Sequence, residues 1–162
     1  MRWLPILFVL GCDPEPTIEE LCAGEGPATI EIGTGAGDAF FPLADGDQVG
    51  LVIAPQGGLG VSVRVRTTGL AAEAAVTARL DSELDGVTSA TFTNDEVFLF
   101  CQDDGTGLFV DQAVGFDPVV YDSLDKQFDL DGKTATLVVE ITDARGVTAE
   151  TTIDVELKVG AR

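Results

Sequence analysis

The sequence predicts an all-β protein that folds as a single-domain antiparallel β-sandwich. Short segments of alternating apolar and polar residues recur along the chain, and Gly, Asp and Pro separate them. The 162 residues are enough for one domain with a sizeable core. Hydrophobic residues make up 45% of the chain, which opposes the disorder that its high charge alone would favour.

The N-terminal residues 1–11 have the pattern of an export signal. Arg2 supplies one positive charge, residues 3–10 are apolar, and a small residue precedes Cys12. The stretch Val9-Leu10-Gly11-Cys12 resembles the lipobox of bacterial lipoproteins. This resemblance implies cleavage before Cys12, acylation of that cysteine with fatty acids such as palmitate, and attachment to a membrane through the lipid.

Residues 12–27 are predicted to be the lipidated cysteine and an acidic tether. The stretch 13–20 reads DPEPTIEE, and its prolines and acids favour an extended, charged chain. We expect the β-sandwich domain to span residues 28–160. The lipobox resemblance implies the envelope of a Gram-negative bacterium, with the outer membrane as the expected location. Asp13 resembles an inner-membrane retention signal of enteric bacteria, so the choice of membrane stays open.

Two further cysteines, Cys22 and Cys101, are predicted to form a disulfide. They are the two that remain after Cys12, and an even number of cysteines in an exported protein is most simply explained by pairing. Closing so long a loop would stabilise the fold by about 4 kcal/mol in the chain-entropy model. A reactive thiol or half of a metal site is the alternative. The chain has no histidine and neither cysteine lies in a CxxC motif, which disfavours that alternative.

Ten strands are expected from residue 28 onward. Their predicted ranges are 28–32, 39–43, 48–53, 60–67, 75–80, 87–92, 97–101, 108–116, 134–142 and 147–159. The last two alternate most regularly and form a hairpin around Asp143-Ala144-Arg145-Gly146. This hairpin resembles the final strands of bacterial immunoglobulin-like domains, which implies an immunoglobulin-like β-sandwich. Within residues 70–84, the four-residue spacing of Val76, Leu80 and Leu84 favours a helix as the alternative to a strand.

A second resemblance lies in the stretch FPLADGD at 41–47 and the stretch LVIAPQGG at 51–58. Together they are similar to a "PLxDGD…GPQGG" segment of uncharacterised Gram-negative surface lipoproteins with a sandwich domain. Members of that family carry a histidine after the paired glycines, whereas Gly60 stands there in this chain and Ala54 replaces a glycine. No metal-binding or partner-binding role is therefore carried over, and both stretches are interpreted as turns.

The composition excludes several classes of function. With 28 acidic and 9 basic residues the net charge is −19, which repels nucleic acids and anionic lipid head groups. The chain has no histidine, and its only Trp and Met lie in the predicted signal. We therefore expect no catalytic residues, no enzyme activity and no cofactor, although calcium at an acidic turn is possible.

Candidate binding residues are of two kinds. Asp129 and Asp131 begin a DxDG turn that could hold calcium, although a turn before the final hairpin explains them equally well. Arg64, Arg66 and Arg79 are three of the few basic residues and are expected to lie together on neighbouring strands. They could contact an anion or a partner, but pairing with Asp or Glu across strands is the favoured interpretation.

These patterns predict a non-catalytic module for protein interaction or structure, anchored in the cell envelope by lipid. Its expected contacts are the membrane, through the lipid on Cys12, and an envelope protein that the sequence does not identify. The alternative is a surface domain that binds calcium or a small ligand.

Overall fold

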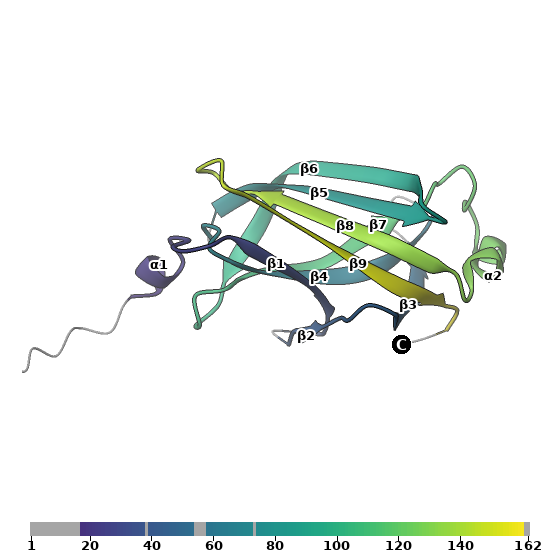
Figure 1. The fold of residues 1–162 in the computed structure, drawn as a ribbon, viewed down its shortest axis with the longest axis horizontal. Helices are drawn as coiled ribbons and strands as arrows, with labels where there is room; N and C mark the ends of the chain where they lie inside the picture. The colour runs from purple at the N-terminus through teal and green to yellow at the C-terminus, as the bar shows by residue number, and fades with distance from the viewer. Residues whose placement is uncertain (1–16, 38, 54–57, 73, 161–162) are drawn as a thin grey trace, which may run out of the picture.

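The structure is a computed structural model that describes residues 17–37, 39–53, 58–72 and 74–160. Within these ranges the chain forms nine strands and three short helices (Figure 1). They are α1 (Ile18–Leu21), β1 (Thr29–Thr34), β2 (Phe41–Pro42), β3 (Asp47–Ile53), β4 (Leu59–Thr68), β5 (Ala74–Leu84), β6 (Val87–Cys101), β7 (Gly107–Gly115), η1 (Leu124–Lys126), α2 (Gln127–Leu130), β8 (Thr134–Thr142) and β9 (Thr148–Lys158). The all-β prediction is confirmed.

Seven of these strands close into a barrel in the order β4-β3-β9-β8-β5-β6-β7, and β7 pairs back with β4. β1 pairs with β4 along the same edge as β3 and carries β2 on its other side, so neither strand is needed to close the ring. All pairings are antiparallel except that between β3 and β9. An immunoglobulin-like sandwich is not confirmed, because β3 and β6 each pair on both sides and join the two sheets that a sandwich would keep apart.

The closing hairpin, β8 and β9, forms where it was predicted and has the predicted alternation. Its pairing runs from Thr134 opposite Glu156 to Thr142 opposite Thr148. On β8 every second residue from Ala135 to Ile141 is buried, and the residues between them are partly exposed. One face of the hairpin therefore contributes to the core and the other faces solvent.

The segment that suggested a helix forms the strand β5 instead. Val76, Ala78 and Leu80 are all buried, whereas Thr77 is partly exposed and Arg79 is exposed. This is the two-residue period of a strand, so the helix alternative is wrong. β5 pairs along its length with β6 on one side and β8 on the other.

Two predicted strands, 87–92 and 97–101, are parts of one strand, β6. The polar residues between them continue the strand through a bulge, since Val76 faces Val97 and Ala78 faces Asn94. Two residues of β6 therefore stand opposite one residue of β5 between these pairs. The bulge lets a polar stretch remain within the sheet.

The two helical regions lie at opposite ends of the long axis. In Figure 1, α1 is at one end, and η1 and α2 are in the connection to β8 at the other. α1 begins with a capping box, in which the Thr17 hydroxyl accepts from the Glu20 amide and the Glu20 carboxylate accepts from the Thr17 amide. Neither helical region was expected from the sequence.

Candidate functional site

The predicted lipidation residue, Cys12, lies outside the described residues, and so does the predicted signal. Cys22, within the segment expected to be a tether, already belongs to the core. Cys22 is buried, and its carbonyl accepts a hydrogen bond of 3.0 Å from the Ala72 amide. A disulfide joins Cys22 to Cys101 at the end of β6, with 5.9 Å between their Cα atoms. This prediction is confirmed.

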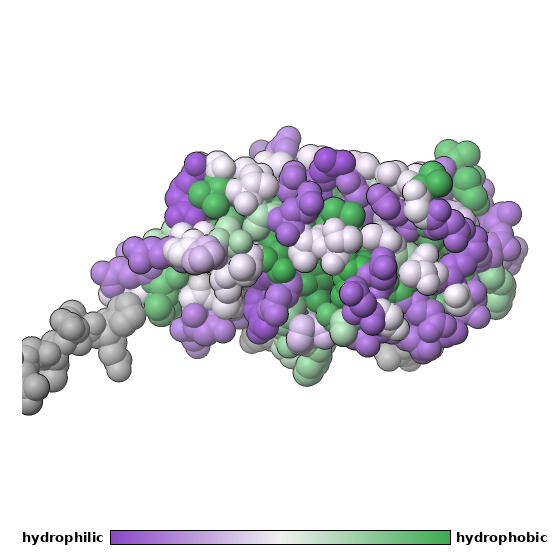
Figure 2. Space-filling view, viewed as in Figure 1, coloured by the Kyte–Doolittle hydropathy of each residue, from purple (hydrophilic) through white to green (hydrophobic). Residues whose placement is uncertain are grey.

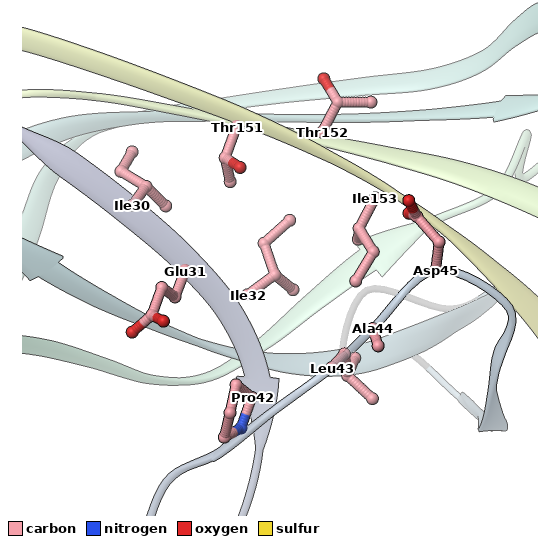
Figure 3. Close-up of a pocket in the computed structure, with 10 residues that line it drawn as sticks. All are labelled: Ile30, Glu31, Ile32, Pro42, Leu43, Ala44, Asp45, Thr151, Thr152 and Ile153. Atoms are coloured by element: carbon pink, nitrogen blue, oxygen red, sulfur yellow. The ribbon is translucent and has the colours of Figure 1, made fainter.

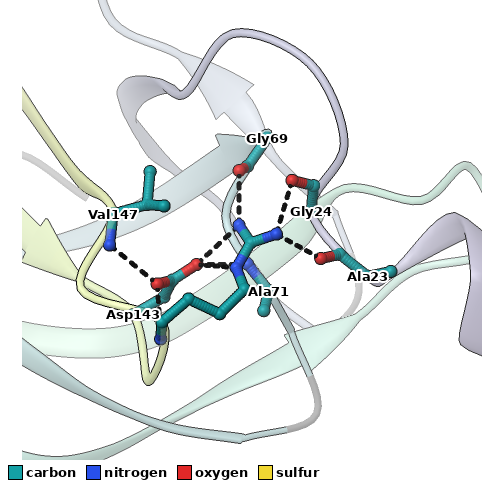
Figure 4. A network of polar contacts seen from close by, with 7 residues as sticks. Ala23, Gly24, Gly69, Ala71, Asp143 and Val147 are labelled. Atoms are coloured by element: carbon teal, nitrogen blue, oxygen red, sulfur yellow. Dashed lines mark hydrogen bonds and ion pairs between the residues drawn. The ribbon is translucent and has the colours of Figure 1, made fainter.

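A second attachment lies beside the disulfide, at the turn between β8 and β9 (Figure 4). The Asp143 carboxylate is fully buried and forms an ion pair of 2.7 Å with Arg145. It also accepts hydrogen bonds from the backbone amides of Ala71 (2.9 Å), Arg145 (2.9 Å) and Val147 (3.0 Å). The carboxylate thus holds the hairpin turn and the connection before β5 together.

The Arg145 guanidinium extends this network to the N-terminal segment. It donates to the carbonyl oxygens of Ala23 (2.6 Å) and Gly24 (2.9 Å), directly after the disulfide cysteine. A third bond of 3.0 Å reaches the carbonyl of Gly69. Three segments that are far apart in the sequence therefore meet at one ion pair.

The network also determines the protonation of Asp143. Burial raises the pKa of its carboxyl group, but the hydrogen bonds from Ala71, Arg145 and Val147 favour the charged form and leave the pKa below its ordinary value. The carboxylate is ionised at neutral pH, as the ion pair with Arg145 requires.

The three arginines singled out in the sequence do not form one cluster. Arg79 lies on β5, which pairs with β6 and β8 and not with β4, where the other two lie. It forms an ion pair of 2.8 Å with Asp81 on its own strand. Arg64 is buried, and its guanidinium donates to the carbonyl oxygens of Gly37 (2.5 Å) and Ala39 (3.0 Å). Arg64 therefore fixes the connection between β1 and β2.

Arg66 is at the centre of a small surface cluster. It pairs with Glu31 of the neighbouring strand β1 at 2.6 Å, and its guanidinium lies 4.5 Å from the centre of the Phe40 ring. Asp104 lines the same shallow pocket, and its pKa is lowered mainly by hydrogen bonds from the hydroxyl and amide of Thr106. Arg66 thus has the cross-strand carboxylate partner that the favoured interpretation expected.

The predicted calcium residues each have other contacts. The Asp129 carboxylate forms an ion pair of 3.6 Å with the Lys126 ammonium group. The Asp131 carboxylate accepts a hydrogen bond of 2.9 Å from the Val159 amide. Among the described residues, no group of three or more Asp, Glu or Cys side chains is arranged to hold a metal ion.

A groove with a volume of about 300 Å³ lies between β1 and β9 (Figure 3). Its lining residues are Ile30, Glu31, Ile32, Pro42, Leu43, Ala44, Asp45, Thr151, Thr152 and Ile153. Figure 3 shows the side chains of Ile30, Ile32 and Ile153 gathered between the two strands, and all three are largely buried. The groove is therefore a depression at the edge of the core whose lining mixes buried isoleucines with threonine and acidic side chains.

Both carboxylates of this groove are already bonded. Glu31 pairs with Arg66, and Asp45 accepts a hydrogen bond of 3.1 Å from the Asp154 amide. The Gly46 amide donates back to the Asp154 carbonyl at 2.8 Å, which ties the connection after β2 to β9. Both acidic side chains of the groove therefore take part in contacts between neighbouring segments of the fold.

No family model matches the chain, and no curated protein sequence matches it. Among solved structures it is similar to a conjugative transposon lipoprotein from Bacteroides eggerthii, with 14% identity and a TM-score of 0.29 over 81% of this chain and 98% of that one. At that TM-score the similarity establishes neither a shared fold nor a shared function. Within the described ranges, no helix is long and apolar enough to cross a membrane.

Proposed function

We propose that this chain is a lipid-anchored, non-catalytic domain of a Gram-negative envelope that binds a protein partner, with the outer membrane as its location. The observation that carries this proposal is the double attachment of the N-terminal segment. The disulfide fixes Cys22, and Arg145 holds the carbonyl groups of Ala23 and Gly24. These contacts would fix the point at which a tether from a lipidated Cys12 meets the folded domain.

The charge of the domain supports a lipid as the anchor. A chain with 28 acidic and 9 basic residues is repelled by anionic head groups, so it gains no electrostatic hold on such a membrane surface. An acyl chain supplies hydrophobic attachment that does not depend on the charge of the protein.

The test is membrane fractionation of cells that express the tagged full chain or its Cys12→Ala variant, with metabolic labelling by a clickable palmitate analogue. We expect the wild type to carry the label and to sediment with outer-membrane vesicles, and the variant to lose both properties. A Cys22→Ala variant is the matched control, because it also removes one cysteine but should keep the label. An unlabelled wild type would refute the lipid anchor.

A further inference from the structure

Apolar side chains are exposed at the end of the barrel opposite to α1. The connection from β7 to β8 carries Val119, Val120, Leu124 and Phe128, which we call the distal platform. Their exposed fractions are 85%, 50%, 54% and 68%. Figure 1 places this connection at the far end of the long axis from α1, and Figure 2 shows apolar side chains at that end. Four large apolar side chains are thus exposed within ten positions of one connection.

The platform is held in place by the residues between its exposed members. The Tyr121 amide donates to the Asp117 carbonyl at 2.8 Å, and the Tyr121 carbonyl accepts from the Leu59 amide at 3.1 Å. The Tyr121 ring packs edge-on against the buried Phe116, at 6.3 Å between ring centres. Leu130 at the end of α2 is fully buried. The apolar side chains therefore project from a fixed backbone, which lowers the entropy lost when a partner binds.

Acidic residues are interspersed with the platform residues along this connection. Five aspartates lie between positions 117 and 131, against one basic residue, Lys126, which is paired with Asp129. This excess of negative charge repels anionic lipids and also a second copy of the same platform. It attracts a surface that carries Lys or Arg.

We propose that the distal platform docks onto a folded partner protein through apolar pockets bordered by Lys and Arg. This inference rests on the proposed function, since it identifies the surface with which the anchored domain would bind its partner. Exposed apolar anchors supply the affinity, and the aspartates supply orientation and rate of encounter. Attachment at the α1 end leaves the platform at the opposite end of the domain.

The test places a photo-crosslinking phenylalanine analogue at Phe128 of the full chain in intact cells, and at Phe41 as the control. Phe41 is also exposed but lies on β2. We expect one discrete adduct at position 128, about tenfold stronger than at position 41. The crosslinked protein is then identified, purified and titrated against the full chain in detergent. The variant V119S/F128S should bind it at least about tenfold more weakly, and the matched variant F41S/V147S should bind it as the wild type does.

Several results would overturn the proposal. They are an equal adduct at both positions, no adduct at position 128, or equal binding of V119S/F128S and the wild type. An adduct at twice the mass of the chain would make a second copy the occupant. If the Cys12→Ala chain sedimented with anionic vesicles and V119S/F128S abolished this, the occupant of the platform would be a membrane. The titration needs no membrane, so the partner can bind the platform even if the labelling experiment refutes the lipid anchor. Failure of the docking proposal and failure of the proposed anchor are therefore distinguishable.

Discussion

Replacing Asp143 with alanine should destabilise the fold more than any other loss of a single ion pair among the described residues. The fully buried carboxylate accepts hydrogen bonds from three backbone amides and forms an ion pair with Arg145. Its removal leaves these donors without their acceptor. Breaking a buried pair costs about 3–5 kcal/mol, and each unsatisfied donor adds to that cost. Arg145 is 41% exposed, so water can solvate its guanidinium after the carboxylate is removed, which limits the cost. We therefore expect Asp143→Ala to lower the free energy of unfolding by about 4 kcal/mol.

The assay is equilibrium urea unfolding, followed by circular dichroism, with thermal melting alongside. For a domain of this size, about 4 kcal/mol corresponds to a melting temperature lower by on the order of 10 °C. The matched control is Lys133→Ala, because Lys133 lies 3.9 Å from an Asp85 side chain that is 81% exposed. That loss should cost less than about 0.5 kcal/mol. The reasoning is wrong if Asp143→Ala unfolds within about 1 kcal/mol of the wild type, or if both variants lose equal stability.

Three further predictions follow from the same contacts. The pKa of Asp143 is lowered in the folded state, so the stabilisation by its carboxylate is complete above about pH 4 and is lost as the pH falls through the folded-state pKa. The difference in urea midpoint between the wild type and Asp143→Asn should therefore shrink below about pH 4. A difference that stays constant with pH would contradict this. Cys101→Ser should cost about 4 kcal/mol in urea unfolding, because the disulfide spans 79 positions, and dithiothreitol should have the same effect on the wild type but none on the variant. Calcium and chelator should give equal melting temperatures, because Asp129 and Asp131 are bonded elsewhere, and a rise with calcium would show that a site exists.

Strands were predictable where alternation was strong, and the errors have physical causes. Val76, Leu80 and Leu84 suggested a helix because four residues is close to one helical turn. Four is also twice the period of a strand, so the same three residues can share one face of a sheet. The residue that distinguishes the two structures is Ala78, which is buried between its larger neighbours but too small to mark an apolar face in the sequence.

The closed barrel and the two attachments depend on contacts between distant segments. Asp143 and Arg145 were predicted only as turn residues, because their partners before β5 and after Cys22 are about 70 and 120 positions away. Local periodicity carries no information about such partners. The disulfide was predictable only because counting cysteines does not depend on their distance along the chain.

The two attachments determine where a force applied to the N-terminal segment would enter the domain. β1 begins at Thr29 and lies outside the closed ring, held by five residue pairs with β4. Without the attachments, tension on the N-terminal segment would reach the barrel through Thr29 and β1. The disulfide meets that tension first, at Cys22, and passes it to the end of β6, while Arg145 passes it to the turn between β8 and β9. β6 and the two strands joined by this turn all belong to the ring, so the tension would reach the ring without passing through β1.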